Sequence, residues 1–138
     1  MSKRYNLVVI GLGIMGRRMI QYMIPHDRFT VIGAWDPSGE SVATAKAEYP
    51  DIKIWDSAEA MIAAPEAELV YIACPPAFHK HYADLAMDAG KPVYCEKPLG
   101  ISVPESEEMV SRLAATGTPN VVNFSQASLE GVEIIEAA

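Results

Sequence analysis

Three glycines near the start of the chain, Gly11, Gly13 and Gly16, are the first residues whose type and spacing suggest chemistry. They follow a short apolar run and precede a stretch with helical character, which is the arrangement typical of a dinucleotide-binding loop. The first glycine permits a tight turn, the second leaves room for a pyrophosphate, and the third lets the helix approach the strand. The helix would also direct backbone N–H groups at the anion. The expected contacts are Gly11, Gly13, Ile14, Met15 and Gly16.

An acidic residue further along the chain supports this interpretation. Asp36 lies 20 residues after Gly16, at the end of a strand expected at residues 29–35. A carboxylate there can accept hydrogen bonds from the adenine ribose hydroxyls, and it would repel the 2′-phosphate of NADP. Because no Arg or Lys lies between Asp36 and Lys46, the sequence predicts NAD in preference to NADP. The alternative is an aspartate that only caps the following turn.

A second group of candidates follows the strand expected at residues 69–73. Cys74, Pro75 and Pro76 come directly after it, and His79 falls in the first turn of the next helix. The prolines lack N–H donors and stiffen the backbone beside the expected cofactor path. Two interpretations of His79 stay open: it contacts the cofactor, or it ties down the local backbone. Cys74 is expected to be a cofactor contact. A cysteine at this position is more often a small buried residue at a strand end than a nucleophile.

The third group is Glu96-Lys97-Pro98, after a strand expected at residues 92–95. Two charged residues at the end of an apolar strand are costly unless they contact each other, a ligand or solvent. Pro98 disfavours helical geometry at Lys97, and the bond between them could be cis. A lysine in a partly dry cleft can exchange a proton with a substrate hydroxyl as a hydride leaves. On spacing alone, the alternative is a surface salt bridge between Glu96 and Lys97.

Alternating strands and helices must bring these groups together. They predict an α/β Rossmann fold, a doubly wound parallel sheet of six strands in the order 3-2-1-4-5-6 with right-handed crossovers. Ligands bind at the carboxyl ends of such strands, between strands one and four. Asp56 with Glu59, and Ser102 with Glu105, form capping patterns that predict two helix starts. The expected strands are residues 7–10, 29–35, 52–55, 69–73, 92–95 and 120–124.

Composition excludes several classes of partner. The chain has 138 residues and a net charge of -7 with scattered basic residues, which predicts one domain that binds neither nucleic acid nor an anionic membrane. It contains no apolar run long enough to span a membrane, and its start leads straight into a core strand without a signal peptide. The two cysteines suggest no disulfide framework, and no metal site is predicted. We therefore expect a cytoplasmic protein.

Four motifs together carry a resemblance to a known family: the loop at residues 11–16, Asp36, residues 74–79 and residues 89–99, which contain Glu96-Lys97-Pro98. They resemble the nucleotide-binding half of the glucose-fructose oxidoreductase, inositol dehydrogenase and rhizopine-catabolism (Gfo/Idh/MocA) family. The resemblance implies NAD(P)-dependent oxidation or reduction of a sugar, cyclitol or similar hydroxyl. It also implies that Lys97 is catalytic, lies near the nicotinamide and helps to position or polarise the reacting oxygen, with Glu96 beside it.

The resemblance also implies a second α/β domain that holds the substrate pocket, with an Asp and a His that complete catalysis. Residues 129–138 show an amphipathic pattern without a capping glycine. We therefore expect an NAD(P)-binding domain at residues 1–125 and, at 126–138, the start of a connection to a C-terminal substrate domain. Such a chain would bind NAD, turn over little or nothing alone, and meet its small-molecule substrate, and possible homo-oligomer contacts, through the other domain. The alternative is a natural single-domain protein.

Two other functions are compatible with parts of the pattern. A stand-alone NAD-sensing regulatory Rossmann module needs the glycine loop and Asp36 but has no use for Glu96-Lys97-Pro98. A methyltransferase also uses a glycine-rich first loop and an acid after the second strand. It fits less well, because three glycines at this spacing suit a pyrophosphate.

Overall fold

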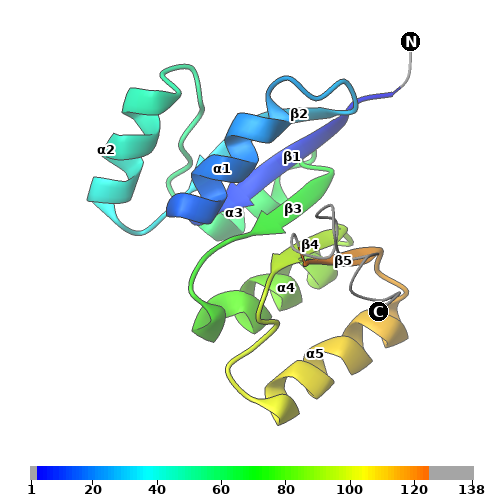
Figure 1. Ribbon diagram of the computed structural model, residues 1–138. Coiled ribbons are helices and arrows are strands. Elements are labelled where there is room, and N and C mark those ends of the chain that lie inside the picture. Colours follow the sequence, from blue (N-terminus) through cyan, green and yellow to red (C-terminus); the bar gives the residue numbers. More distant parts are fainter. Residues whose placement is uncertain (1–2, 125–138) are drawn as a thin grey trace, which may run out of the picture.

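The computed structural model describes residues 3–124, which form a parallel sheet with helices on both faces (Figure 1). The sheet has five strands in the order β2-β1-β3-β4-β5. The strands are β1 (Tyr5–Ile10), β2 (Phe29–Trp35), β3 (Leu69–Ile72), β4 (Val93–Glu96) and β5 (Asn120–Asn123). The helices are α1 (Ile14–Met23), α2 (Gly39–Glu48), α3 (Ala58–Ala63), the 3₁₀-helix η1 (Pro76–Phe78), α4 (His79–Asp88) and α5 (Val103–Thr116).

Strand β1 lies between β2 and β3 and is buried on both faces. Its side chains alternate: Leu7 and Val9 pack in the cluster that includes α1 and α2, whereas Val8 and Ile10 pack in the cluster that includes α3, α4 and α5. All four side chains have no exposed surface. This explains the continuous apolar run, because a parallel strand covered by helices on both faces has no polar side.

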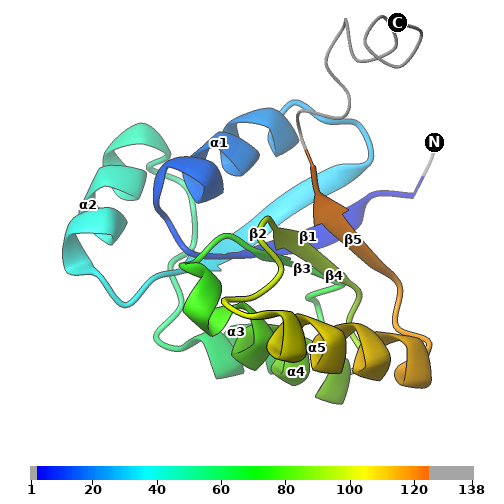
Figure 2. The ribbon, with the colours of Figure 1, turned by 60° about the horizontal axis from the view of Figure 1, so that its bottom comes forward.

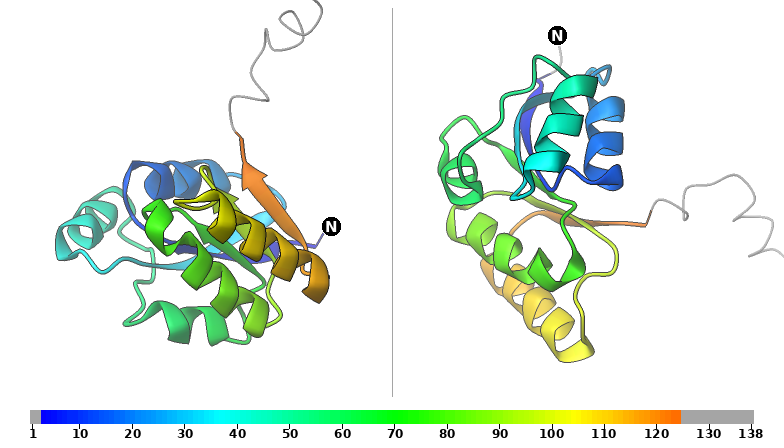
Figure 3. Two further views of the ribbon diagram at one scale, coloured as in Figure 1. Left: turned by 90° about the horizontal axis from the view of Figure 1, so that it is seen from below. Right: turned by 90° about the vertical axis from the view of Figure 1, so that its left-hand side faces the viewer.

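The helices form two layers that enclose the sheet. Figure 2 shows α1 and α2 on one face and α3, α4 and α5 on the other, and Figure 3 shows the same arrangement from two further sides. Within residues 3–124, no helix is long and apolar enough to cross a membrane. The layers leave the carboxyl ends of β1, β2 and β3 at one edge, where the loops that follow them meet.

The predicted count of six strands is wrong for the described residues. Residues 52–55, expected as the third strand, form only an isolated parallel bridge between Ile54 and Ala34, at the outer edge of β2. The indole of Trp55 lies against Gly33, so close that a Cβ on that glycine would be 2.4 Å from Nε1. This segment therefore meets β2 through side-chain packing and two backbone hydrogen bonds instead of a full ladder, and the predicted six-strand order is not confirmed.

Helix starts and stops mostly follow the expected residues. The Ser102 hydroxyl accepts from the Glu105 N–H at 3.3 Å, and the Glu105 carboxylate accepts from the Ile101 N–H at 2.8 Å. At α3, however, the cap is Ser57 and not Asp56, because the Ser57 hydroxyl accepts from the Ala60 N–H at 3.1 Å. The helix expected from residue 129, and the expected domain connection at 126–138, lie outside the described residues.

Candidate cofactor-binding and active site

A cleft of about 760 Å³ lies at the carboxyl edge of the sheet, where the loops after β1, β2 and β3 meet. Its walls come from the glycine loop, the end of β2 and the segment before α4. Predicted contact residues on these walls are Gly11, Gly13, Ile14, Met15, Asp36, Cys74 and Pro75. The other predicted residues, Gly16, Pro76, His79, Glu96 and Lys97, do not line this cleft.

The three glycines differ in what surrounds them. Gly11 has a φ of +93°, and a Cβ there would lie 2.6 Å from the Cys74 backbone nitrogen. A Cβ on Gly16 would lie 1.8 Å from the Gly11 carbonyl oxygen, so α1 can approach β1 only because this residue has no side chain. Around Gly13 there is nothing within 4 Å of the Cβ position. Gly11 and Gly16 therefore allow the loop to pack tightly against its neighbours. Gly13 leaves space between the loop and the cleft.

The start of α1 suits an anion. Gly13 is its N-cap residue, and no side chain caps the helix there. The backbone N–H groups of the first turn are therefore left for a ligand or solvent, and they carry the positive end of the helix dipole. Because Gly13 has no side chain, a pyrophosphate has room to approach these N–H groups. The residues present thus fit the diphosphate of a dinucleotide.

Asp36 links the end of β2 to the glycine loop. One carboxylate oxygen accepts from the Leu12 N–H at 2.7 Å, and the other accepts from the Ser38 N–H at 2.7 Å. The second contact is the turn cap that was the alternative interpretation of this residue. The first contact places the carboxylate beside the loop as well. Each oxygen can accept more than one hydrogen bond, so capping the turn and binding a ribose hydroxyl are compatible.

Arg17 supports the same loop, and the sequence patterns did not single it out. Its Nη1 donates to the Leu12 carbonyl at 2.7 Å, and its Nε lies 3.1 Å from a Glu48 carboxylate oxygen on α2. The Tyr49 hydroxyl in turn donates to the Arg17 carbonyl at 3.3 Å. The loop is therefore held from β2 by Asp36 and from α2 through Arg17. A long-range contact of this kind leaves no local sequence signal.

Aromatic side chains that no sequence motif indicated form a further wall of the cleft. Trp35 and Tyr82 meet edge to face, with ring centroids 5.8 Å apart. Phe78 is 53% exposed at the mouth of the cleft. Burial raises the pKa of Tyr82. These rings give the cleft an apolar face beside Asp36, which suits a flat base.

His79 is 1% exposed, and both of its ring nitrogens face backbone carbonyl groups. Nδ1 lies 2.9 Å from the Pro98 oxygen, and Nε2 lies 2.8 Å from the Cys74 oxygen. This geometry favours the interpretation that His79 ties down the backbone. Cys74 is only partly buried, not buried as predicted, because it lines the cleft. This partial burial still raises the pKa of its thiol to about 12, which keeps the thiol protonated at neutral pH and disfavours a nucleophilic role.

Glu96 is directed into the protein, not toward Lys97. It is 5% exposed, and one oxygen accepts hydrogen bonds from the Tyr71 hydroxyl and the Asn123 side-chain amide. Burial, and then the hydrogen bond to Glu96, raise the pKa of Tyr71. Within residues 3–124, no salt bridge joins Glu96 to Lys97. The salt-bridge alternative is therefore wrong, because the carboxylate is instead held by Tyr71 and Asn123.

Lys97 is exposed between two anchored neighbours. Glu96 is held by the network in the sheet, and the Pro98 carbonyl is held by His79. The Lys97–Pro98 peptide bond is cis, one of the two forms that a bond before proline allows. Lys97 is thus presented on the surface at the same edge of the sheet as the glycine loop.

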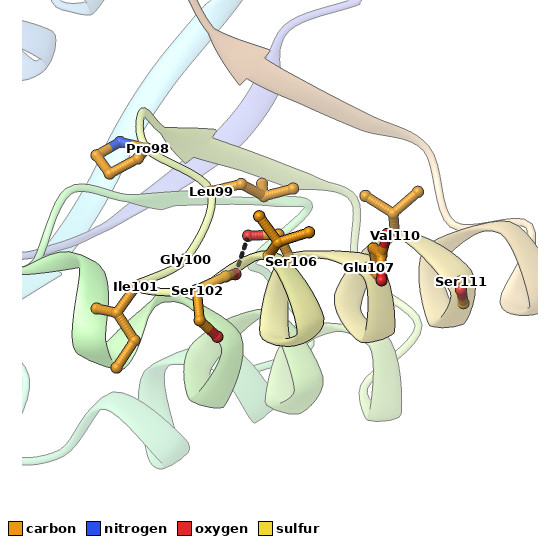
Figure 4. A pocket seen from close by; sticks show the side chains of 10 residues that line it. Pro98, Leu99, Gly100, Ile101, Ser102, Ser106, Glu107, Val110 and Ser111 are labelled. Atoms are coloured by element: carbon orange, nitrogen blue, oxygen red, sulfur yellow. Dashed lines mark hydrogen bonds between the residues drawn. The ribbon is translucent and has the colours of Figure 1, made fainter.

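A second hollow of about 770 Å³ lies between residues 98–103 and the outer face of α5 (Figure 4). Its side chains are mainly small or apolar, and the Ser106 hydroxyl donates to the Ser102 carbonyl at 2.9 Å within it. Glu107 is its one ionisable side chain. Because this hollow lacks the glycine loop and a carboxylate at a strand end, we assign the cofactor site to the cleft between β1, β2 and β3.

A parallel sheet with this glycine loop and an acid after β2 defines a dinucleotide-binding Rossmann domain. Comparison with known families agrees: residues 5–124 match the model described as "Oxidoreductase family, NAD-binding Rossmann fold". The chain belongs to this family, Gfo/Idh/MocA.

Individual relatives support the assignment. The chain is 32% identical over 134 residues to inositol 2-dehydrogenase from Acidiphilium cryptum, covering 94% of this chain and 39% of that protein. It is 31% identical over 112 residues to scyllo-inositol 2-dehydrogenase (NADP(+)) IolU from Bacillus subtilis, covering 81% and 34%. A crystal structure of an NAD-binding protein from Listeria innocua matches with a TM-score of 0.86 and 30% identity, covering 97% of this chain and 39% of that one. The chain thus spans well under half the length of these relatives.

Proposed function

We propose that the chain is the nucleotide-binding domain of an NAD-dependent dehydrogenase that acts on a cyclitol, sugar or similar hydroxyl. The observation that carries the proposal is the free space around Gly13, which lies in front of the uncapped start of α1 and beside Asp36. The family match supports the oxidoreductase class. The cyclitol rests on the names of two relatives, both inositol dehydrogenases.

The residues of this chain would have distinct roles. Backbone N–H groups at the start of α1 would bind the pyrophosphate, and Asp36 would accept from the adenine ribose. Bound NAD would supply the hydride acceptor. Lys97 would hold or move a proton at the reacting oxygen of the substrate, a role supported by the family resemblance and by its exposed position beside anchored neighbours.

We infer a preference for NAD over NADP from Asp36. Its carboxylate beside the loop would repel a 2′-phosphate. One relative carries NADP(+) in its name, so cofactor choice varies among similar proteins and must be measured for this chain. Two free cysteines are compatible with the proposed reducing, cytoplasmic location.

Catalysis would need more residues than the described part of the chain offers, because the substrate pocket is expected on a second domain. We therefore propose that this chain binds NAD but turns over little or no substrate alone. The role of Lys97 would be tested by Lys97→Ala in a protein that includes that domain. Unchanged turnover there would remove Lys97 from the mechanism.

Amide chemical shifts during a titration with NAD would test the binding site itself. We expect the largest changes at residues 11–16 and near Asp36, with small changes around the second hollow beside α5. If the changes gather at α5, or if none appear at millimolar NAD, the proposed function is wrong.

A further inference from the structure

We propose that His79 is a positioning residue for Lys97, which it serves through the Pro98 backbone. This inference rests on the proposed function, in which Lys97 works beside the nicotinamide. His79 does not line the cofactor cleft. Its action would therefore be indirect, through the chain segment that carries the lysine.

The His79 ring joins two loops at the carboxyl edge of the sheet. Its nitrogens lie 2.8 Å from the Cys74 oxygen, after β3, and 2.9 Å from the Pro98 oxygen, after β4. A carbonyl oxygen can only accept, so the ring must donate to at least one of the two groups. Because the ring is 1% exposed, water cannot readily replace it. Removing it would leave the Cys74 and Pro98 carbonyl groups without this partner.

Glu96 provides the matching anchor on the other side of Lys97. Its carboxylate accepts from Tyr71 and Asn123, and Tyr71 packs in the cluster that includes α1. His79 begins α4, on the opposite face of the sheet. The residue before Lys97 and the residue after it are therefore fixed from two different layers. The backbone of Lys97 is thereby held in place, so the position of its ammonium depends on the side-chain rotamer alone.

The contacts of His79 make the proposal selective. They involve the Cys74 and Pro98 carbonyl groups and leave the contacts between Asp36 and Leu12 untouched. Cys74 lies on the wall of the cofactor cleft, whereas Pro98 follows Lys97 directly. Loss of the ring should therefore weaken contacts near the nicotinamide more than those to the adenosine diphosphate half. A residue that merely stabilised the fold would affect both halves alike or neither.

Binding of NADH and ADP to the chain separates these outcomes, because ADP lacks the nicotinamide and its ribose. The ratio of the two affinities reports the nicotinamide half alone. Lys97 is also expected to contact the cofactor, through one hydrogen bond from its ammonium to the nicotinamide half. We therefore expect Lys97→Ala to reduce this ratio about tenfold, the worth of one hydrogen bond that involves a charged group. His79→Ala should reduce it to a similar extent. The double variant should lose no more than Lys97→Ala does, since both changes remove the same interaction.

Two further variants complete the experiment. His81→Ala changes an exposed histidine on the same helix and should leave the ratio unchanged. His79→Gln keeps one hydrogen-bond donor, so the ratio of affinities should fall less than in His79→Ala. This variant also allows the measurement if His79→Ala does not fold. An unchanged ratio in both His79 variants, or a double variant with the summed loss, overturns the proposal. If the unmodified chain binds neither ligand, the proposed function fails first and the inference falls with it.

Discussion

The Asp36 carboxylate accepts a hydrogen bond from the Leu12 backbone N–H at 2.7 Å, so the acid after β2 is part of the wall of the glycine loop. Its other oxygen accepts from Ser38, at the start of α2. One side chain thus fixes the loop, caps a turn and places negative charge where the adenine ribose would bind. The position of that charge leads to the first prediction.

We expect the chain to bind NAD at least tenfold more tightly than NADP, and Asp36→Ala to remove most of that difference. The reason is the repulsion between the carboxylate and a 2′-phosphate. The variant should also lower the free energy of unfolding by about 1–3 kcal/mol, because two backbone N–H groups lose their acceptor. Calorimetry with both cofactors and urea denaturation would measure these effects. Asp27→Ala, at an exposed acid, is the control. Equal affinities in the unmodified chain would contradict the prediction.

Two glycine substitutions should affect different properties, NAD binding in one case and the stability of the fold in the other. Gly13→Val should leave the melting temperature nearly unchanged, because there is nothing within 4 Å of the added Cβ and the φ of -66° suits any residue. It should abolish NAD binding, because the valine side chain would fill the space that the pyrophosphate needs. Gly16→Ala should destabilise the fold by several kcal/mol, since its Cβ would lie 1.8 Å from the Gly11 oxygen.

Thermal unfolding and NAD titration of both glycine variants would check this contrast. A Gly13→Val chain that binds NAD with unchanged affinity would show that the pyrophosphate lies elsewhere. A Gly16→Ala chain of normal stability would show that α1 is not tightly packed against the loop.

The two thiols should make the fold sensitive to alkaline pH. Burial raises the pKa of Cys74 and of Cys95 to about 12 from the usual 9.0. A raised pKa in the folded state means that the stabilisation is complete below pH 9 and is lost as the pH rises toward 12, because the unfolded chain releases protons first. Urea denaturation at pH 8 and pH 10 should show the loss, and Cys95→Ala should reduce it. Iodoacetamide at pH 8 should modify both thiols far more slowly in the folded than in the unfolded chain.

Acid should weaken the contact between α4 and α5. Burial raises the pKa of Asp84, but hydrogen bonds from Lys80 and Arg112 outweigh it and bring the value below 3.8. Since the folded value is depressed, this stabilisation is present above pH 4 and is lost as the pH falls through the folded pKa. Asp84→Asn should therefore cost about 1 kcal/mol at pH 7, and the cost should shrink at pH 3. Asp88→Asn, at a side chain that is 65% exposed, should cost less. An equal loss at both pH values would contradict this.

Local patterns were sufficient for the parts of the structure that depend on neighbours in sequence. Gly11 and Gly16 occupy the close contacts that their spacing predicted. Ser102 caps α5, and Gly117 ends it with a φ of +64°. Each of these features requires a particular backbone conformation or a missing Cβ within a few residues, which is why residue type reveals it.

Features that depend on distant residues could not be predicted in this way. Tyr71 and Asn123 meet Glu96 only after 25 and 27 residues of chain have folded back into the sheet. The Pro98 carbonyl lies 19 residues from His79. Residues 52–55 have the composition of a strand, but the packing of Trp55 over Gly33 decides that they form only a bridge. The residue types of a segment alone do not indicate which tertiary contacts it will make.

Strand β5 has a consequence for anyone who handles the protein. Within residues 3–124 it pairs with β4 alone, and Val121 on it is 58% exposed. A strand from another molecule can pair with an exposed edge strand of this kind, so high protein concentration should favour aggregation. Mutual repulsion from a net charge of -7 works against such encounters. Dilute, low-salt samples should accordingly stay monodisperse longest.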